Sequence, residues 1–207
     1  MVDKDQVKKL LHTYFQWNGD VEVQDDGSVN VSGNVALMYA PPNGVIPVQF
    51  GIVDGDFRAE NKKLTSLRNV PDSCHSLYVS ANHVQSLEYC PVYLNILDVE
   101  YNLLTNFAHA PEQVDTIIAF GNPLTSLTGL PESEYAINIT YREQLPLLRL
   151  VDAENVHIGS KGFGYDRYKR YEPVDSIINK YLGQGKAGAL KAAGELIKAG
   201  FKENARW

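Results

Sequence analysis

The sequence predicts a repeat solenoid with short parallel strands and separate capping structures at its two ends. The main observation is a period of twenty residues in the middle of the chain, kept by both prolines and asparagines. The positions that share this step are Pro71, Pro91, Pro111 and Pro131, and Asn82, Asn102 and Asn122. A fixed period of this length is typical of a stacked solenoid, in which each unit buries its apolar side chains only against its neighbours.

Apolar residues follow the same period. The clearest copy has apolar residues at five positions, Leu94, Leu97, Val99, Leu104 and Phe107. The copies before and after it keep the pattern with Cys74, Leu77, Val79, Val84 and Leu87, and with Val114, Ile117, Ala119, Leu124 and Leu127. Because each unit buries so few side chains, no repeat is expected to fold alone.

Each repeat is expected to contain one short strand followed by a turn. The alternation in Leu97-x-Val99 has a period of two, which indicates a strand with both side chains turned inward. Asn102 follows where the chain must turn, and an amide there can satisfy backbone groups that the strand no longer pairs. The repeated asparagines are therefore predicted to form a structural ladder along the solenoid.

This pattern resembles the leucine-rich repeat, in the short twenty-residue form found in effectors of pathogenic bacteria and in many small phage proteins. The resemblance covers roughly residues 54–146 and weakens at both edges, where Lys62 and Arg142 occupy the asparagine position. It implies an α/β solenoid, a leucine-rich-repeat stack of about four to five repeats with a parallel sheet. It also implies that the x residues of each strand form a face that binds partners.

An N-terminal cap is predicted over residues 1–53. Residues 3–17 place their apolar side chains on one helical face, which predicts a helix that ends at Asn18-Gly19. Two alternating runs then flank Asp25-Asp26-Gly27, and this arrangement predicts a β-hairpin. The helix and the hairpin are expected to cover the first repeat.

The repeats are predicted to span residues 54–151, because the apolar run 145–151 would close the open edge of the sheet. Residues 152–207 are expected to form a basic aromatic linker and a C-terminal two-helix cap. The first helix follows Pro173, and the second covers residues 187–199, with an apolar face of Leu190, Ala193 and Ile197. This tail also resembles the tails of small phage proteins that carry such repeats.

Charge is distributed unevenly along the chain, whose formal net charge is −6. Residues 160–207 contain ten Lys and Arg against five Asp and Glu, a net charge of +5. Residues 1–159 contain nine against twenty, a net charge of −11. An acidic body argues against nucleic acid wrapped along the solenoid, because phosphate neutralisation needs a basic stripe.

Residues that carry chemistry are sparse. Gly183-x-Gly185-x-x-Gly188 matches the dinucleotide fingerprint in its letters, but it links two predicted helices and has no strand before it. The five histidines are scattered and have no second metal ligand or acid at the required spacing. Cys74 and Cys90 form no disulfide framework, which favours a cytoplasmic location. We therefore expect no enzyme activity, cofactor, metal or membrane contact.

The outward positions of the predicted strands are the candidate partner-binding residues. They are Arg58, Glu60, Tyr78, Asp98, Glu100, Ile118, Phe120 and Asn138, with Tyr101 nearby. Two large apolar side chains on one outward strand, Ile118 and Phe120, are the kind of centre that carries binding energy in protein interfaces. In the alternative interpretation, the N-terminal cap or the C-terminal helices cover these two residues, and the polar positions are merely solvated.

The basic aromatic stretch 161–171 is a second candidate surface. Its candidate partner-binding residues are Tyr165, Arg167, Tyr168, Lys169 and Arg170. Three interpretations remain open: an ordered linker that packs tyrosines under the solenoid, a protein contact, or a nucleic-acid contact. In the last case the basic residues would bind phosphates and Tyr168 would stack on a base.

The function expected from these patterns is that of a protein-binding module. The phage resemblance implies a host protein as the partner, such as a defence component, which the solenoid would inhibit by covering its surface. In that case the chain would act in the host cytoplasm. The alternatives are a nucleic-acid-associated phage accessory protein that uses the basic C-terminal end, and a structural protein of the virion.

Overall fold

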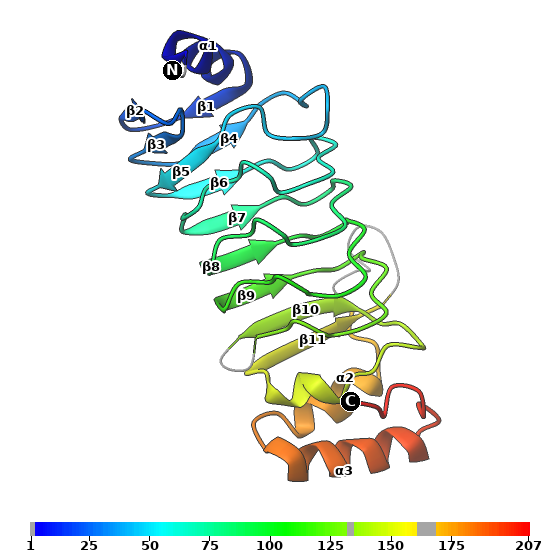
Figure 1. The fold of residues 1–207 in the computed structure, drawn as a ribbon. Helices are drawn as coiled ribbons and strands as arrows, with labels where there is room; N and C mark the ends of the chain where they lie inside the picture. Colours follow the sequence, from blue (N-terminus) through cyan, green and yellow to red (C-terminus); the bar gives the residue numbers. More distant parts are fainter. Residues whose placement is uncertain (1–2, 132–134, 161–168) are drawn as a thin grey trace.

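The computed structural model describes residues 3–131, 135–160 and 169–207 and shows a β-solenoid of about six turns (Figure 1). Its elements are α1 (Lys4–Tyr14), β1 (Phe15–Trp17), β2 (Val21–Val23), β3 (Val29–Val31), β4 (Val35–Leu37), β5 (Phe50–Val53), β6 (Asp56–Arg58), β7 (Ser76–Tyr78), β8 (Tyr93–Asp98), β9 (Gln113–Ile118), β10 (Ala136–Thr140), the 3-10 helix η1 (Leu148–Asp152), β11 (Asn155–Gly159), α2 (Val174–Lys180) and α3 (Gly185–Lys198). The strands stack along the long axis of the molecule, with α1 at one end and α3 at the other.

The main sheet has the strand order β1-β4-β6-β7-β8-β9-β10-β11 within the described residues. All of its strands are parallel except β1, which pairs with β4 in the antiparallel direction. One inward position of each strand from β6 to β11 lies in register along the core, as Phe57, Leu77, Leu97, Ile117, Ile137 and Val156. All six side chains are buried. The inward register predicted from the Leu97-x-Val99 alternation is therefore confirmed.

The asparagine ladder is present and buried. The side-chain oxygen of Asn102 accepts a hydrogen bond from the N–H of Val84 at 2.9 Å, and its amide nitrogen donates to the carbonyl of Val79 at 2.9 Å. Asn82 and Asn122 make the corresponding contacts one turn earlier and one turn later. Each amide thus joins its own turn to the turn before it, as predicted.

The N-terminal helix is shorter than predicted. The carboxylate of Asp3 caps α1 by accepting hydrogen bonds from the N–H groups of Asp5 and Gln6. The helix ends at Tyr14 because Phe15 is extended and pairs with Leu37 of β4, so residues 15–17 form a strand. The predicted hairpin is present as the antiparallel pair β2 and β3, and β3 continues as a parallel pair with β5 in a second sheet.

The main sheet continues past residue 151, where the period predicted the end of the repeats. The apolar run 145–151 forms no edge strand, and its last part belongs to η1, with Leu150 and Val151 buried. Strand β11 then adds to β10 with His157 beside Asn138, a step of nineteen residues. The changed step and the missing ladder asparagine explain why the period did not reveal this strand.

The outer edge of β11 is covered. The N–H of Ile158 donates to the carboxylate of Asp175 at 2.6 Å, and the carbonyl of Val156 accepts a hydrogen bond from Asn179 at 2.9 Å. The N–H of Tyr171 donates to the carbonyl of Ile158 at 2.8 Å. An unpaired sheet edge invites pairing with another chain, so these contacts prevent further strand addition at this end.

Helix α3 packs through small side chains against η1 and α2. Its buried residues are Gly188, Ala189, Ala192 and Leu196. The predicted apolar face is wrong for its two large residues, because Leu190 is 68% exposed and Ile197 is 54% exposed, whereas Ala193 packs against the core. The small residues let α3 approach its neighbours closely, and Glu195 accepts hydrogen bonds from Lys180 and Tyr181 of the preceding segment, both at 2.6 Å.

Two positions have left-handed backbone in each of four successive turns of the solenoid. The first lies just before the ladder asparagine, at Asn61, Ala81, Tyr101 and Gly121, and the second lies two residues before the repeated proline, at Asn69, Tyr89, His109 and Gly129. A residue with a Cβ atom pays about 1–2 kcal/mol for this conformation, whereas glycine does not. Most of these turns therefore store strain.

Replacing Tyr89 with glycine is expected to raise the free energy of unfolding by up to about 1 kcal/mol. The side chain is 54% exposed and its φ is 73°, so little packing is lost while the left-handed strain disappears. Urea denaturation measures the change. Tyr93→Gly is the matched control, because Tyr93 is 60% exposed in β8, and this substitution should destabilise the protein by roughly 0.5–1 kcal/mol. A destabilising effect of both substitutions would contradict the strain at residue 89.

Candidate functional site

The candidate surface is the outer face of the main sheet, where the predicted residues form a continuous row. Arg58, Tyr78, Asp98, Ile118 and Asn138 lie in register on neighbouring strands, and His157 extends the row on β11. All six side chains are partly exposed. His157 is the one member of the row that the repeat pattern missed, since the strand that carries it was not recognised.

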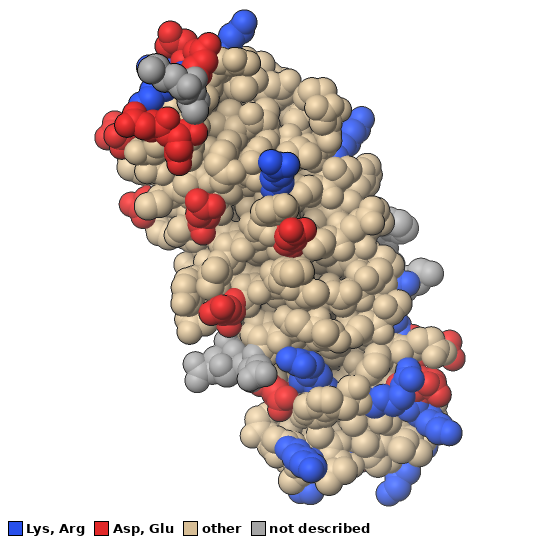
Figure 2. Space-filling view, in the orientation of Figure 1, with Lys and Arg blue, Asp and Glu red and all other residues tan. Residues whose placement is uncertain are grey.

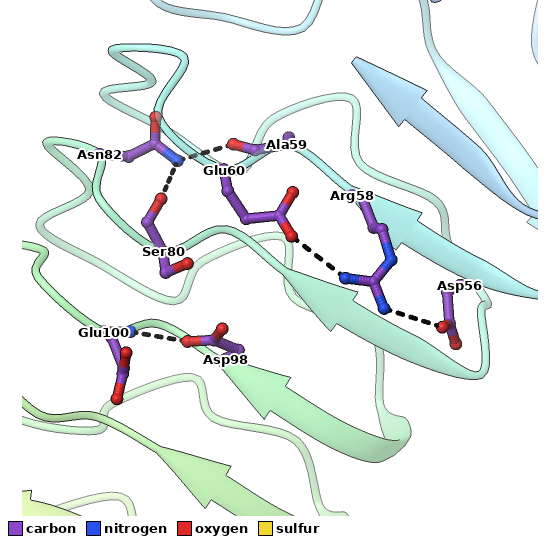
Figure 3. A network of polar contacts seen from close by, with 8 residues as sticks. All are labelled: Asp56, Arg58, Ala59, Glu60, Ser80, Asn82, Asp98 and Glu100. Atoms are coloured by element: carbon purple, nitrogen blue, oxygen red, sulfur yellow. Dashed lines mark hydrogen bonds and ion pairs between the residues drawn. The ribbon is translucent and has the colours of Figure 1, made fainter. Parts of the chain in front are cut away.

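Arg58 is held in place at the N-terminal part of this row (Figure 3). Its guanidinium lies 3.2 Å from the Glu60 carboxylate and 3.4 Å from that of Asp56, and its Cζ atom is 3.8 Å from the centre of the Tyr78 ring. Burial alone would lower the pKa of Arg58, but Glu60, Tyr78 and Asp56 together raise it above its ordinary value. The arginine therefore stays charged in a fixed orientation, with the two carboxylates on either side and the ring beneath it.

The next outward strand carries carboxylates that are less accessible than predicted. The N–H of Glu100 donates to the carboxylate of Asp98 at 3.1 Å, which bends the chain after β8 (Figure 3). Glu100 is only 8% exposed, whereas Asp98 is partly exposed. Of the two, Asp98 is the residue that a partner can reach.

The predicted role of Phe120 as an exposed aromatic centre is wrong. Its side chain is 2% exposed, and its ring packs edge to face on His157 at 5.3 Å. Strand β9 ends at Ile118, so the alternation of inward and outward side chains stops there and both Ala119 and Phe120 are buried. Ile118 remains partly exposed in the row.

Tyr101 is also engaged within the solenoid. Its ring lies over Gly121 of the next turn, where an added Cβ atom would come within 2.4 Å of the ring. Gly121 thus provides the space that Tyr101 occupies, and Tyr101 is partly buried as a result. Only part of the Tyr101 ring is therefore accessible to a partner.

The second candidate surface lies mainly outside the described residues. Tyr165, Arg167 and Tyr168 are among residues 161–168, which the structure does not describe. Lys169 and Arg170 are exposed, and Arg170 forms an ion pair with the buried Asp175. Because Asp175 also caps Ile158, Arg170 has a structural role in closing the edge of β11.

Charges separate along the face shown in Figure 2, with carboxylates at the end that carries α1, β2 and β3, and basic residues near α2 and α3. Residues 3–34 contain six Asp and Glu against three Lys. Residues 169–207 contain eight Lys and Arg against four Asp and Glu. The separation of acidic and basic residues that the sequence predicts is therefore also present in the folded molecule.

Other chemistry is limited in the part of the chain that the structure describes. No group of three metal-ligating side chains is present there, and no helix in these ranges is long and apolar enough to cross a membrane. Burial raises the pKa of the Cys74 thiol to about 12 and also raises that of Cys90, so both are poor nucleophiles. The Gly183-x-Gly185 stretch joins α2 to α3 and follows no strand, unlike a dinucleotide-binding turn.

Comparison with protein-family models, with curated proteins and with solved structures found no match to this chain. The geometry of the chain itself therefore carries the functional argument. That geometry is a repeat β-solenoid whose parallel sheet presents one ordered outward row.

Proposed function

We propose that this protein is a binding module that recognises another protein through the outer face of its main sheet. The observation that supports it best is the ordered cluster of Arg58, Tyr78, Asp56 and Glu60. Arginine and tyrosine are enriched among the residues that dominate interface energies. A side chain that is already fixed loses little conformational freedom on binding, which favours affinity.

The size of the face limits the proposal. Seven parallel strands about 4.8 Å apart span roughly 29 Å, and with about 13 Å of strand length this is on the order of 400 Å². A standard interface buries about 800 Å² on each partner. The partner must therefore also touch a flank of the solenoid. The exposed Tyr89, Val92 and Tyr93, at the entry to β8, provide such a flank.

The identity of the partner follows only from the sequence resemblance. We propose that the solenoid is a short leucine-rich-repeat stack, with α1 and the β2–β3 hairpin at one end and α2 and α3 at the other as its caps, and that it is encoded by a phage. Its partner would then be a host protein, such as a component of a defence system, which is blocked by surface occlusion without a cofactor. The repeat pattern with its asparagine ladder supports the leucine-rich-repeat assignment.

Affinity capture from nuclease-treated bacterial lysate tests the proposal. The tagged protein should retain one host protein in stoichiometric amount, and Arg58→Ala with Tyr78→Ala should weaken that binding by at least about 2 kcal/mol, or roughly thirtyfold. Tyr39→Ala removes a ring that is 65% exposed elsewhere and should bind like the unmodified protein. If the double variant binds with unchanged affinity, the partner does not bind to the sheet face at Arg58 and Tyr78. Recovery of nucleic acid alone would favour the basic C-terminal end as the functional region.

A further inference from the structure

Helix α3 presents an apolar and basic face to solvent at one end of the molecule. Leu190 and Ile197 are seven residues apart, so they lie on the same face of the helix two turns from each other. They are 68% and 54% exposed. Single exposed leucines are common on protein surfaces. Two aligned apolar residues on a terminal helix instead form an apolar ridge, and exposure of this ridge to water is unfavourable.

Lysines surround this ridge. Lys186, Lys191 and Lys198 are exposed, and none of them forms a salt bridge within the described ranges. The acidic residue of α3, Glu195, is already bound by Lys180. Like charges in contact repel, so the ridge does not fit the same ridge of a second molecule. Its complement is an apolar groove with an acidic rim.

Such a groove is lined by residues of the second sheet and its connections. The strands of this sheet, β2, β3 and β5, lie near the end of the solenoid opposite to α3 (Figure 1). The groove is a hollow of about 270 Å³ lined by the apolar side chains of Val21, Val31 and Ile52, and Ile52 is 56% exposed. Asp20 and Glu22 stand at this hollow and form no salt bridge in the described part of the protein. A third carboxylate of the lining, Asp54, lies 3.3 Å from Nε2 of His75.

We propose that α3 of one molecule docks in this groove of a second copy of the chain, so that the protein associates head to tail. Leu190 and Ile197 would fill the hollow, and Lys191 and Lys198 would approach Asp20 and Glu22. The two surfaces lie near opposite ends of one molecule, so α3 cannot reach the groove of its own chain. The charges of the two ends, −3 over residues 3–34 and +4 over residues 169–207, are complementary.

The contact is heterologous, and this determines what it builds. Each molecule keeps one free ridge and one free groove after pairing, so association continues into longer chains unless a ring closes. The fourteen residues of α3 are about 21 Å long, which gives a footprint on the order of 250 Å². This is well below the roughly 800 Å² per partner of a stable complex, so the association is weak, reversible and sensitive to salt.

Sedimentation velocity of the full chain, from micromolar to millimolar concentration, measures the association. The weight-average mass should rise with concentration at low salt and fall when salt is added. Leu190→Ser with Ile197→Ser, and separately Asp20→Lys with Glu22→Lys, should each weaken association at least about tenfold. Leu103→Ser removes an apolar side chain that is 44% exposed in the middle of the solenoid, away from both surfaces, and should leave the association unchanged.

A mixing experiment separates this arrangement from other modes of self-association. The Leu190→Ser, Ile197→Ser variant keeps an intact groove, and the Asp20→Lys, Glu22→Lys variant keeps an intact helix. Each variant alone should be monomeric, whereas their mixture should form one-to-one dimers and no larger species.

Three results would overturn the proposal. A monomer at all concentrations shows that the ridge does not bind a second copy. Self-association that both variants retain places the contact on another surface. A mixture that stays monomeric, or that forms long chains, is incompatible with one ridge and one groove per molecule. None of these results bears on binding by the main sheet, whose variants are at Arg58 and Tyr78.

Discussion

Asn102→Ala is expected to lower the free energy of unfolding by about 3–5 kcal/mol. The side chain is 2% exposed and bonds to four backbone groups, the N–H of Val84 and the carbonyls of Val79, Val99 and Glu100. Alanine leaves the N–H of Val84 without a partner, which costs roughly 1–3 kcal/mol. The carbonyls of Val79 and Val99 keep the hydrogen bonds from Asn82 and Asn122, so each loses only one bond, worth about 1 kcal/mol. Because two of these groups belong to the preceding turn, the loss spreads beyond the mutated repeat.

Chemical denaturation followed by circular dichroism measures this loss. Asn95→Ala is the matched control, because Asn95 belongs to the same repeat but is exposed, and its replacement should change stability by no more than about 0.5 kcal/mol. Equal effects of the two substitutions would mean that the ladder contributes no more to stability than a surface amide.

Leu97→Ala is expected to cost about 2–5 kcal/mol through a cavity in the core. Leu97 is fully buried between Leu77 and Ile117 of the neighbouring strands, so the space cannot be filled by rotating a surface side chain. Ile96→Ala removes a branched side chain from the outer face of the same strand, where it is partly exposed. It should cost less than about 1.5 kcal/mol, since little core volume is lost. If Ile96→Ala lowers the free energy of unfolding more than Leu97→Ala does, then Ile96 and not Leu97 faces the core, and the assignment of the two faces of β8 is wrong.

The repeat region was predictable because each of its positions is determined by contacts that recur every twenty residues. Leu97 and Asn102 meet the same environment as Leu77 and Asn82, so their identities reveal their burial and their hydrogen bonds. The hairpin was predictable for a local reason, since Asp25-Asp26-Gly27 sets the turn within a few residues.

The unpredicted features depend on contacts between distant parts of the chain. Strand β11 exists because β10 offers it an edge and Asp175 closes the other side. Phe120 is buried where its strand has already ended, and its partner His157 lies on that unrecognised strand. In α3 the small residues pack inward, so a pattern based on the largest apolar residues selected the wrong face.

The asparagine ladder also has a genetic consequence. Each rung bonds to the turn before it, and a rung of identical geometry follows after twenty residues, or sixty nucleotides of coding sequence. An in-frame duplication or deletion of that length inside the array restores every rung at the new junction. Recombination between the copies therefore changes the length of the protein by a whole turn, about 4.8 Å along the axis, while it leaves both ends intact.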